Sequence, residues 1–452
     1  MTTVAVVGGG ITGLTAAYRL RRELGAHADI VLLEPGRLGG KLRTEDLAGG
    51  PVDLGAEAFI ARRPEVPELL AELGLADEIR YPSGLTPLVW SQGGLRAIPT
   101  RTLMGIPSSA ESVAGLVDAA TVERIRREPE TPVPWAPGTD IDVHTLVASR
   151  FGEQVVYRSV DPMLGGVYSG RSDTIGVRAA LPALAAALDG GAASLTEAVA
   201  EALPEPRPGP VFGALERGYG SLLDALYAAA APRLVHAAAT RISRSDGRWV
   251  VDPVGAVDGI VLAVPAPAVA ALLGDVSPLA ASAAARIPLA SSAVVALALP
   301  TDDGLPQNTG ILVASDSPLT PDASAKAFTL SSRKWPHLAE RDVTLVRASY
   351  GRFGDDAIVD APDDTLVATA RRDLALATGA DGEPVAARVQ RWHGGLPQYG
   401  PGHTEDVAEL EAALAAVPRV EVAGALLHGV GVPACIATAR TAVTRLLADL
   451  TG

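Results

Sequence analysis

Two patterns of apolar residues along the chain predict its main elements. Continuous apolar runs at 4–7, 30–33 and 258–263 predict buried parallel strands, because such strands are covered on both faces. Apolar positions at helical spacing predict helices that end at 24 and 231, and helices at 66–75 and 363–378. Runs bounded by Pro, Gly or Asp predict a hairpin at 85–99 and strands at 233–242, 248–254, 286–300, 309–315, 326–330 and 342–350. This alternation predicts an α/β fold, or α+β overall.

The first strand runs into a glycine-rich turn. The turn consists of Gly8, Gly9, Gly10, Ile11, Thr12 and Gly13, and Glu34 follows the second strand. Gly8 permits the turn, Gly10 lets backbone approach a pyrophosphate, and Gly13 lets the helix pack on the sheet. The pyrophosphate would lie at the helix N-terminus, and Glu34 would accept hydrogen bonds from a ribose. An ordinary glycine turn is the alternative, but the strand, the helix and the acid together favour a dinucleotide site.

A second glycine pair follows Glu34. Gly39 and Gly40 are flanked by Arg37, Lys41 and Leu42, which suits an extended dinucleotide held along its whole length. The pattern resembles the two-dinucleotide flavoprotein family, in which FAD is the resident cofactor. We therefore expect FAD, and a nicotinamide enzyme is an alternative that the colour of the protein would exclude.

Three further segments carry candidate chemistry. Gly55, Ala56, Glu57 and Ala58 form a small-residue turn that suits a flat ring system, although a plain surface turn is the alternative. The Gly-rich segment 161–171 either lines a pocket for a large flat ligand or forms a helix–helix elbow. Near the C-terminus, 420–433 again gives a strand, glycines and a helix start, which predicts an anion- or ring-binding end.

The recurrence of this signal at both chain ends predicts a discontinuous nucleotide domain. We expect the FAD domain at 1–85, 211–275 and 389–452, a mixed-sheet substrate domain at 86–100 and 276–388, and a helical insert at 101–210. A chain of 452 residues is long enough for two or three such domains.

Composition narrows the function further. The net charge of −14 argues against a nucleic-acid partner. The lone Cys435 excludes an internal disulfide and suits a reducing compartment, so we expect a cytoplasmic protein. Neither a signal peptide nor a spanning helix is evident, which leaves peripheral membrane contact open. His393 and His403 lack an acid in ligand register, so no metal site is predicted.

Together these segments resemble the bacterial oxygen-dependent porphyrinogen oxidases of haem synthesis, relatives of the amine-oxidase flavoproteins. The resemblance covers nearly the whole chain, and its narrowest part is Arg391-Trp392 followed by Pro397-Gln398-Tyr399 and Gly402-His403. It implies FAD contacts from the two glycine turns and Glu34, from 55–58, and from the strand near Thr240. Contacts are also implied from Trp392, Gly424, Val430, Gly431 and Val432.

In this family a porphyrinogen would be oxidised to a porphyrin by hydride transfer to flavin N5, with dioxygen as acceptor and peroxide as product. No catalytic side chain is then required, because the flavin supplies the redox chemistry. The substrate's propionates need cations, and the candidates are Arg62, Arg63, Arg96 and Arg171. For each arginine the alternative is a charge that is simply solvated at the surface. The candidates for lining the pocket are Gly165, Gly166 and Tyr168. A transient contact with the next enzyme of the pathway is a further expectation.

The likeness to bacterial members favours coproporphyrinogen III, with protoporphyrinogen IX as the alternative. Departures from the family pattern at Pro87, Arg171, His428 and Ala434 leave carboxylate recognition open. Two rival functions remain: an amine-oxidase-like flavoenzyme, and a flavin-fold protein that binds a tetrapyrrole without turning it over.

Overall fold

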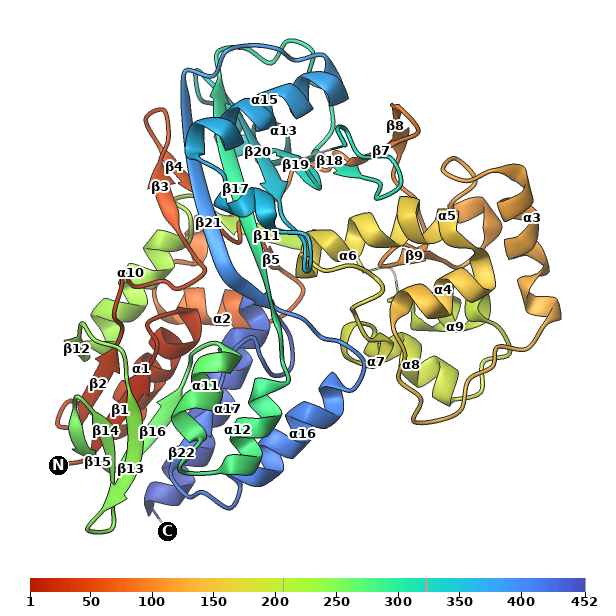
Figure 1. Cartoon of the computed structure of the whole chain (residues 1–452). Helices are drawn as coiled ribbons and strands as arrows, with labels where there is room; N and C mark the ends of the chain where they lie inside the picture. Colours follow the sequence, from red (N-terminus) through yellow and green to blue (C-terminus); the bar gives the residue numbers. More distant parts are fainter. Residues whose placement is uncertain (206, 322–323, 452) are drawn as a thin grey trace.

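A five-stranded parallel sheet brings the two ends of the chain together in the lower part of Figure 1. The computed structural model describes residues 1–205, 207–321 and 324–451. The sheet order is β12 (Arg233–Val235), β2 (Asp29–Leu33), β1 (Thr3–Val7), β16 (Gly259–Leu262) and β22 (Val420–Val422). Neighbouring strands are parallel throughout. The first and last strands in the sequence therefore belong to one sheet.

Alternate residues of β1 enter two different cores. Val4 and Val6 pack with α1 (Ile11–Leu24), α2 (Glu65–Glu72), α10 (Tyr219–Ala230) and α17 (Val432–Thr451). Ala5 and Val7 pack with α11 (Ala266–Leu273), α12 (Pro278–Ala285), α16 (His403–Leu414) and the small sheet β13 (Arg241–Ser245), β14 (Arg248–Asp252) and β15 (Gly255–Val257). The sheet is covered on both faces, as its continuous apolar strands predict.

A seven-stranded mixed sheet forms the upper part of Figure 1. Its order is β21 (Ala386–Pro397), β17 (Leu289–Leu299), β20 (Thr344–Tyr350), β19 (Ala327–Leu330), β18 (Gly310–Val313), β7 (Leu88–Ser91) and β8 (Gly94–Ala97). The β18–β7 pair is parallel and the other pairs are antiparallel. Helix α15 (Asp363–Thr378) shares a core with this sheet, and α13 (Ser331–Lys334) and α14 (Pro336–Ala339) follow β19.

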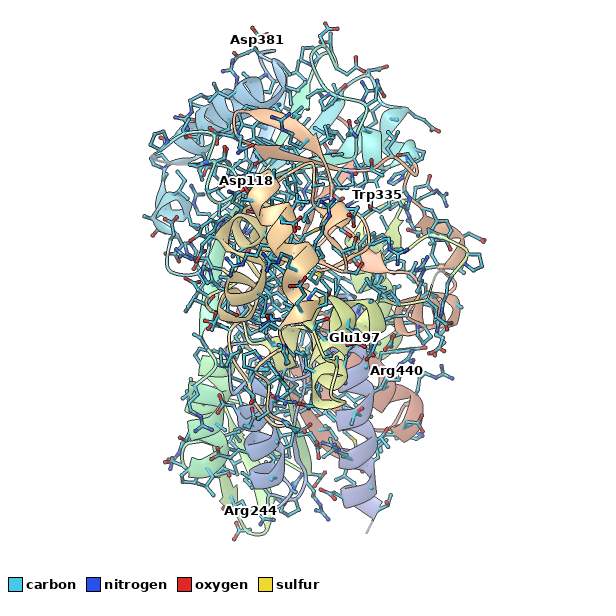
Figure 2. The ribbon with its side chains drawn as sticks, turned by 90° about the vertical axis from the view of Figure 1, so that its right-hand side faces the viewer. Asp118, Glu197, Arg244, Trp335, Asp381 and Arg440 are labelled. Atoms are coloured by element: carbon cyan, nitrogen blue, oxygen red, sulfur yellow. The ribbon has the colours of Figure 1, made fainter. Side chains whose placement is uncertain are left out.

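A helical part lies on the right of Figure 1. Its residues follow β8 of the upper sheet and precede β12 of the parallel sheet in the sequence. It contains α3 (Ala119–Arg127), α4 (Val143–Phe151), α5 (Glu153–Val155), α6 (Asp161–Tyr168), α7 (Val177–Ala180), α8 (Pro182–Asp189) and α9 (Leu195–Ala202) around their own apolar core. In Figure 2 this part, with Asp118 and Glu197, faces the viewer in front of the others.

Short strands complete the fold. They are β3 (Thr44–Asp46) with β4 (Pro51–Asp53), β9 (Thr102–Leu103) with β10 (Ile106–Pro107), and β11 (Phe212–Leu215) between β5 (Phe59–Ile60) and β6 (Ile79–Arg80). Within the described part of the chain, no helix combines the length and apolar character needed to cross a bilayer.

The predicted α/β class is confirmed, and so are the strands and helices on either side of the first glycine turn. The predicted strand at 233–242 was wrong. The structure divides it into β12 and β13, which belong to different sheets. The reason lies at 236–240, where the chain leaves the edge of the parallel sheet after pairing with β2.

Candidate cofactor and substrate site

The β1–α1 turn is built for close backbone packing. Gly8 has a φ of +106°, and a Cβ there would overlap the Ala263 carbonyl after β16. A Cβ at Gly13 would overlap the Gly8 carbonyl, so α1 can lie this close only with glycine at both positions. At Gly10, the N-cap of α1, the nearest atom to a Cβ placed on the backbone would be 3.8 Å away. The turn is therefore tightly packed at Gly8 and Gly13 and leaves space beside Gly10.

Glu34 stands at the C-terminal end of β2, beside this turn. One carboxylate oxygen accepts the Gly9 N–H at 2.8 Å and the other accepts the Gly36 N–H at 3.0 Å. The backbone N–H of Glu34 donates to the Val235 carbonyl at 3.0 Å. The acid is thus fixed by backbone groups at the sheet edge where Rossmann-type folds bind a ribose.

The second glycine pair packs directly on the first turn. Gly39 N–H donates to the Gly9 carbonyl at 2.8 Å, and a Cβ at Gly40 would lie 3.0 Å from the Gly10 Cα. Arg37 braces the loop, because its guanidinium donates to the carbonyls of Leu38, Gly40 and Leu42 at 2.9–3.2 Å. The side chain of Arg37 holds the loop in shape rather than extending from it.

The N-terminal ends of α1 and α17 lie next to each other. Gly424 connects them, because its N–H donates to Thr438 Oγ1 of α17 at 3.0 Å and its Cβ position is 3.6 Å from the Thr12 Oγ1 of α1. Neither first turn contains an acidic residue. Two helix ends with free N–H groups make this region electropositive.

Lys41 adds a positive charge at the same place. Burial lowers its pKa, and its charge in turn lowers the pKa of the Cys435 thiol against the larger raising effect of burial. Among the residues that the structure describes, none pairs with the Lys41 ammonium. A diphosphate is the kind of group that this combination would hold.

Trp392 of β21 and the segment at 54–58 meet at the other end of the loop. The indole Nε1 donates to the Leu54 carbonyl at 3.0 Å, and a Cβ at Gly55 would lie 3.1 Å from the indole ring. Arg37 lies over the same ring at 5.9 Å from its centroid. Residues more than 300 positions apart in the sequence are thus in direct contact.

The carboxylate of Glu57 is already engaged. It accepts from the Lys334 ammonium and the Trp335 indole, each at 2.7 Å, and pairs with Arg347. Burial alone would raise the pKa of Glu57, but Lys334 and Arg347 outweigh it and lower the pKa to about 2. Trp335 is labelled in Figure 2. Only the backbone of Glu57 is left to meet a ligand.

Asp53, just before this segment, is a second buried carboxyl group. It accepts from Thr44 Oγ1 at 2.5 Å and from the Tyr219 N–H at 3.1 Å, at the start of α10. Burial raises its pKa to about 7, against the lowering effect of these two hydrogen bonds. Asp53 therefore holds α10 against the turn that carries Gly55.

Tyr399 fixes the closing turn before α17 from two sides. Its hydroxyl donates to the Ala425 carbonyl at 2.6 Å and accepts the Gly429 N–H at 2.9 Å. His403 stacks on the ring with centroids 3.9 Å apart. Because Tyr399 follows β21, the turn at 424–431 is tied to the upper sheet.

Comparison with known proteins identifies the family. The family model described as "Flavin containing amine oxidoreductase" matches residues 11–447. The chain belongs to this family. The family description implies a flavin cofactor.

Several full-length relatives bear one name. Proteins named coproporphyrinogen III oxidase from Mycobacterium leprae and Propionibacterium freudenreichii are 52% and 32% identical, over 98% and 97% of this chain and 98% and 89% of theirs. A solved structure from Exiguobacterium sp. 255-15, assigned as a protoporphyrinogen oxidase, is 30% identical with a TM-score of 0.87, over 100% of this chain and 99% of that one. Cyclohexylamine oxidase from Brevibacterium oxydans shares the fold at 17% identity and a TM-score of 0.69, over the whole of both chains.

The structure places Thr240, a predicted contact residue, outside the parallel sheet. It is exposed five residues beyond the end of β12, and its N–H donates to the Asp252 carbonyl in the small sheet. Its contact with a cofactor stays a prediction. Val235, which sequence reasoning missed, is the residue that accepts from Glu34. The run Ala237-Ala-Ala was the available signal in the sequence that the strand ends at this point.

The predicted propionate arginines do not converge. Arg62 donates to the carbonyls of Arg207 and Gly209, Arg63 pairs with Glu65, Arg171 pairs with Asp173, and Arg96 is exposed on β8. All four side chains are exposed. This favours the solvated alternative for each.

The pocket candidates on α6 do lie near the closing turn. The Tyr168 ring is 5.7 Å from that of Tyr399, and nothing lies within 4 Å of a Cβ placed at Gly166. Gly165 packs against Arg352, a residue that sequence reasoning missed. The segment is a helix ended by Ser169 in the left-handed conformation, with φ +49°.

Two cavities lie away from this site. One of about 470 Å³ lies between α15 and β21, and one of about 180 Å³ lies between α16, β22 and α17. No group of three or more His, Cys, Asp or Glu side chains in the described ranges is arranged to hold a metal ion.

Proposed function

We propose that this chain oxidises coproporphyrinogen III to coproporphyrin III, with FAD as resident cofactor and dioxygen as electron acceptor. The observation that supports the cofactor assignment is that the N-termini of α1 and α17 and Lys41 come together beside the open face of Gly10. The names of the full-length relatives support the substrate.

The residues fit FAD along its length. Glu34 would bind the adenosine ribose, and the first turns of α1 and α17 would bind the diphosphate with Lys41. The side chain of Trp392 and the backbone at 55–58 would border the ring system. The open glycine faces at Gly10, Gly424 and Gly431, where no atom lies within about 3.5 Å of a placed Cβ, leave the room that such a ligand needs.

When bound, the flavin supplies hydride acceptance from the carbon bridges of a porphyrinogen. The residues of the chain orient the macrocycle and exclude water. The open Gly166 face of α6 would receive the tetrapyrrole, and Tyr399 would keep the closing turn in place beneath it. Pyrrole protons can leave to solvent as conjugation grows, so no side chain needs to act as a strong base.

Protoporphyrinogen IX is the second candidate, because the Exiguobacterium structure is assigned to that activity. The deciding experiment is anaerobic single-turnover reduction of the bound flavin by each porphyrinogen, with putrescine and cyclohexylamine as amine substrates in parallel. We expect the flavin to bleach fastest with coproporphyrinogen III, and porphyrin fluorescence and peroxide to appear once air is admitted. Faster bleaching by protoporphyrinogen IX would reverse the substrate preference, and bleaching by amines alone would overturn the proposal.

The cofactor is tested separately. Heat-released cofactor from the purified protein should run as FAD on chromatography, and release of FMN would contradict the assignment to an extended dinucleotide. For partners and location, we keep dioxygen as a proposed reactant and propose a cytoplasmic location. Peripheral membrane contact is tested by vesicle flotation, and a transient contact with the next pathway enzyme is tested by co-purification.

A further inference from the structure

Arg352 is an inward-facing cation at the junction of α6 and the upper sheet. It follows β20 in a turn closed by backbone hydrogen bonds with Asp355 at 2.9 Å. Its guanidinium lies so close to α6 that a Cβ at Gly165 would overlap Nη1. Nη1 is buried, and no described residue forms a hydrogen bond or an ion pair with this guanidinium.

An unpaired cation in such a place needs an anion. Burial lowers the pKa of Arg352 more than the nearby charges of Asp161 and Asp355 raise it, so the loss of solvent is only partly compensated. A guanidinium that is removed from water is unfavourable unless a carboxylate or similar group replaces the solvent. Arginine also offers a planar pair of donors that matches a carboxylate.

The neighbouring carboxylate of Asp161 is engaged elsewhere. It accepts from the Ser172 N–H at 3.0 Å and from Ser315 Oγ at 2.6 Å. Asp355, in the Arg352 turn, is exposed. The protein's own acids therefore leave Arg352 free to bind an external carboxylate.

Lys326 holds the segment that carries Arg352. It is 6% exposed, and its ammonium donates to Ser169 Oγ at 2.6 Å and to the Gly351 carbonyl at 2.8 Å. Ser169 ends α6 and Gly351 immediately precedes Arg352. Lys326 thus connects the end of α6 to the backbone of the arginine turn.

The same junction is connected to the closing turn of the cofactor site. Gln398 Nε2 donates to the Tyr168 carbonyl at 2.8 Å, while its buried Oε1 has no hydrogen-bond partner among the described residues. The next residue, Tyr399, holds the turn at 424–431. Arg352 therefore lies on the α6 side of the same site.

We propose that Arg352 binds a propionate carboxylate of the porphyrinogen, and that Lys326 is a positioning residue for it. This inference rests on the proposed function and names the group that recognises the substrate. Coproporphyrinogen III carries one propionate on every pyrrole ring, so a carboxylate is available whichever ring approaches α6. Protoporphyrinogen IX carries propionates on two rings, so only some orientations supply one.

The test measures binding of coproporphyrin III to the flavin-loaded enzyme by fluorescence titration, together with KM and kcat for coproporphyrinogen III. Coproporphyrin III tetramethyl ester, which has the same ring but no carboxylates, is titrated under the same conditions. The variants are Arg352→Gln and Arg352→Lys. Arg127→Gln is the matched control, since Arg127 pairs with Glu130 on the surface of the helical part.

We expect Arg352→Gln to weaken binding of the tetra-acid about tenfold or more and to raise KM, because a charge-assisted hydrogen bond is lost. Binding of the ester should stay within about twofold, and Arg352→Lys should lie between wild type and Gln. Arg127→Gln should match wild type with both ligands. Equal tetra-acid binding by wild type and Arg352→Gln would overturn the inference.

A second variant tests the inference if Arg352→Gln does not fold. Gly165→Ala keeps the charge and displaces it, since only the mobile end of Arg352 has to move. It should weaken binding of the tetra-acid more than that of the ester, and an equal effect on both would count against the inference. If wild type neither binds coproporphyrin III nor oxidises any porphyrinogen, the proposed function fails instead.

Discussion

The glycine turns at the start of α1 and α17 and the junction around Arg352 are proposed anion sites that are built by different means. In the first region the donors are backbone N–H groups, which the fold itself orients, and the nearby acids are held by backbone contacts. In the second region the proposed donor is the side chain of Arg352, and the buried Lys326 holds the backbone beside it. A backbone site depends on shape and tolerates change in side chains, whereas a side-chain site is lost with one substitution.

Under the proposed function the α1–α17 region serves the cofactor and the Arg352 region serves the substrate. The predictions below separate the two regions, beginning with the contact between the segment at 54–58 and the upper sheet.

The largest effect is expected at Glu57. Replacement by Ala removes the acceptor for Lys334, Trp335 and Arg347 and leaves two partly buried cations unpaired. We expect a loss of about 3–5 kcal/mol in the free energy of unfolding, measured by urea denaturation. Glu130→Ala, which breaks a surface pair with Arg127, should cost about 0.5 kcal/mol. Similar values for the two variants would show that Glu57 is not a structural junction.

The next effect is expected at Gly13. A Cβ there would meet the Gly8 carbonyl, which is backbone and cannot move aside. Gly13→Ala should lose about 1–3 kcal/mol of stability and most of its bound flavin, measured by absorbance per mole of protein. Gly382→Ala, at a position with nothing within 4 Å, is the control and should retain both. Full flavin occupancy in Gly13→Ala would contradict the assignment of this turn.

Lys326 should give the Arg352 region a characteristic pH dependence. Burial and the charge of Arg352 lower its pKa from 10.5 to about 7. Above about pH 7 the folded protein releases this proton, but the unfolded chain keeps it up to about pH 10.5, so stability should rise with pH in that window. Lys326→Met should reduce this rise in melting temperature. An unchanged slope would mean that Lys326 keeps its proton in the fold.

Asp53 should give the cofactor region the opposite slope. Burial raises its pKa from 3.8 to about 7, so between these values only the unfolded chain has lost the proton. This contribution to stability is complete below about pH 3.8 and is lost as pH rises through about 7. Between about pH 5 and about pH 8 the melting temperature of Asp53→Asn should therefore fall less than that of wild type. Parallel curves would contradict the raised pKa.

The sequence predicts the first region well because its signals are local. The strand, the turn from Gly8 to Gly13 and Glu34 all fall within residues 3–34, and Gly13 packs against Gly8 of the same turn. The error at 233–242, where one strand was predicted, arose because the fold and not the local pattern decides which sheet a strand joins. Trp392 was predicted through family resemblance, since its contact with Leu54 spans 338 residues.

The second region could not be read in the same way. Arg63 and Arg171 looked like propionate ligands, but each has an acid two residues later, at Glu65 and Asp173, and pairs with it on the surface. Arg352 lies far in sequence from Gly165, and its burial depends on how α6 meets the upper sheet. One local hint existed: Lys326 stands alone among small and apolar residues at the start of a strand, where a solvated lysine is unusual.

If the flavin lies between α1 and α17 as proposed, the order of strands in the parallel sheet sets when the chain can acquire it. The first glycine turn is synthesised early, but the strand β22 and the helix α17 that complete its surroundings are synthesised after all the other elements described above. The flavin can be held from both sides only once these two elements have left the ribosome. A message truncated before α17 would thus yield a product that contains the whole fingerprint of a dinucleotide site and retains no pigment.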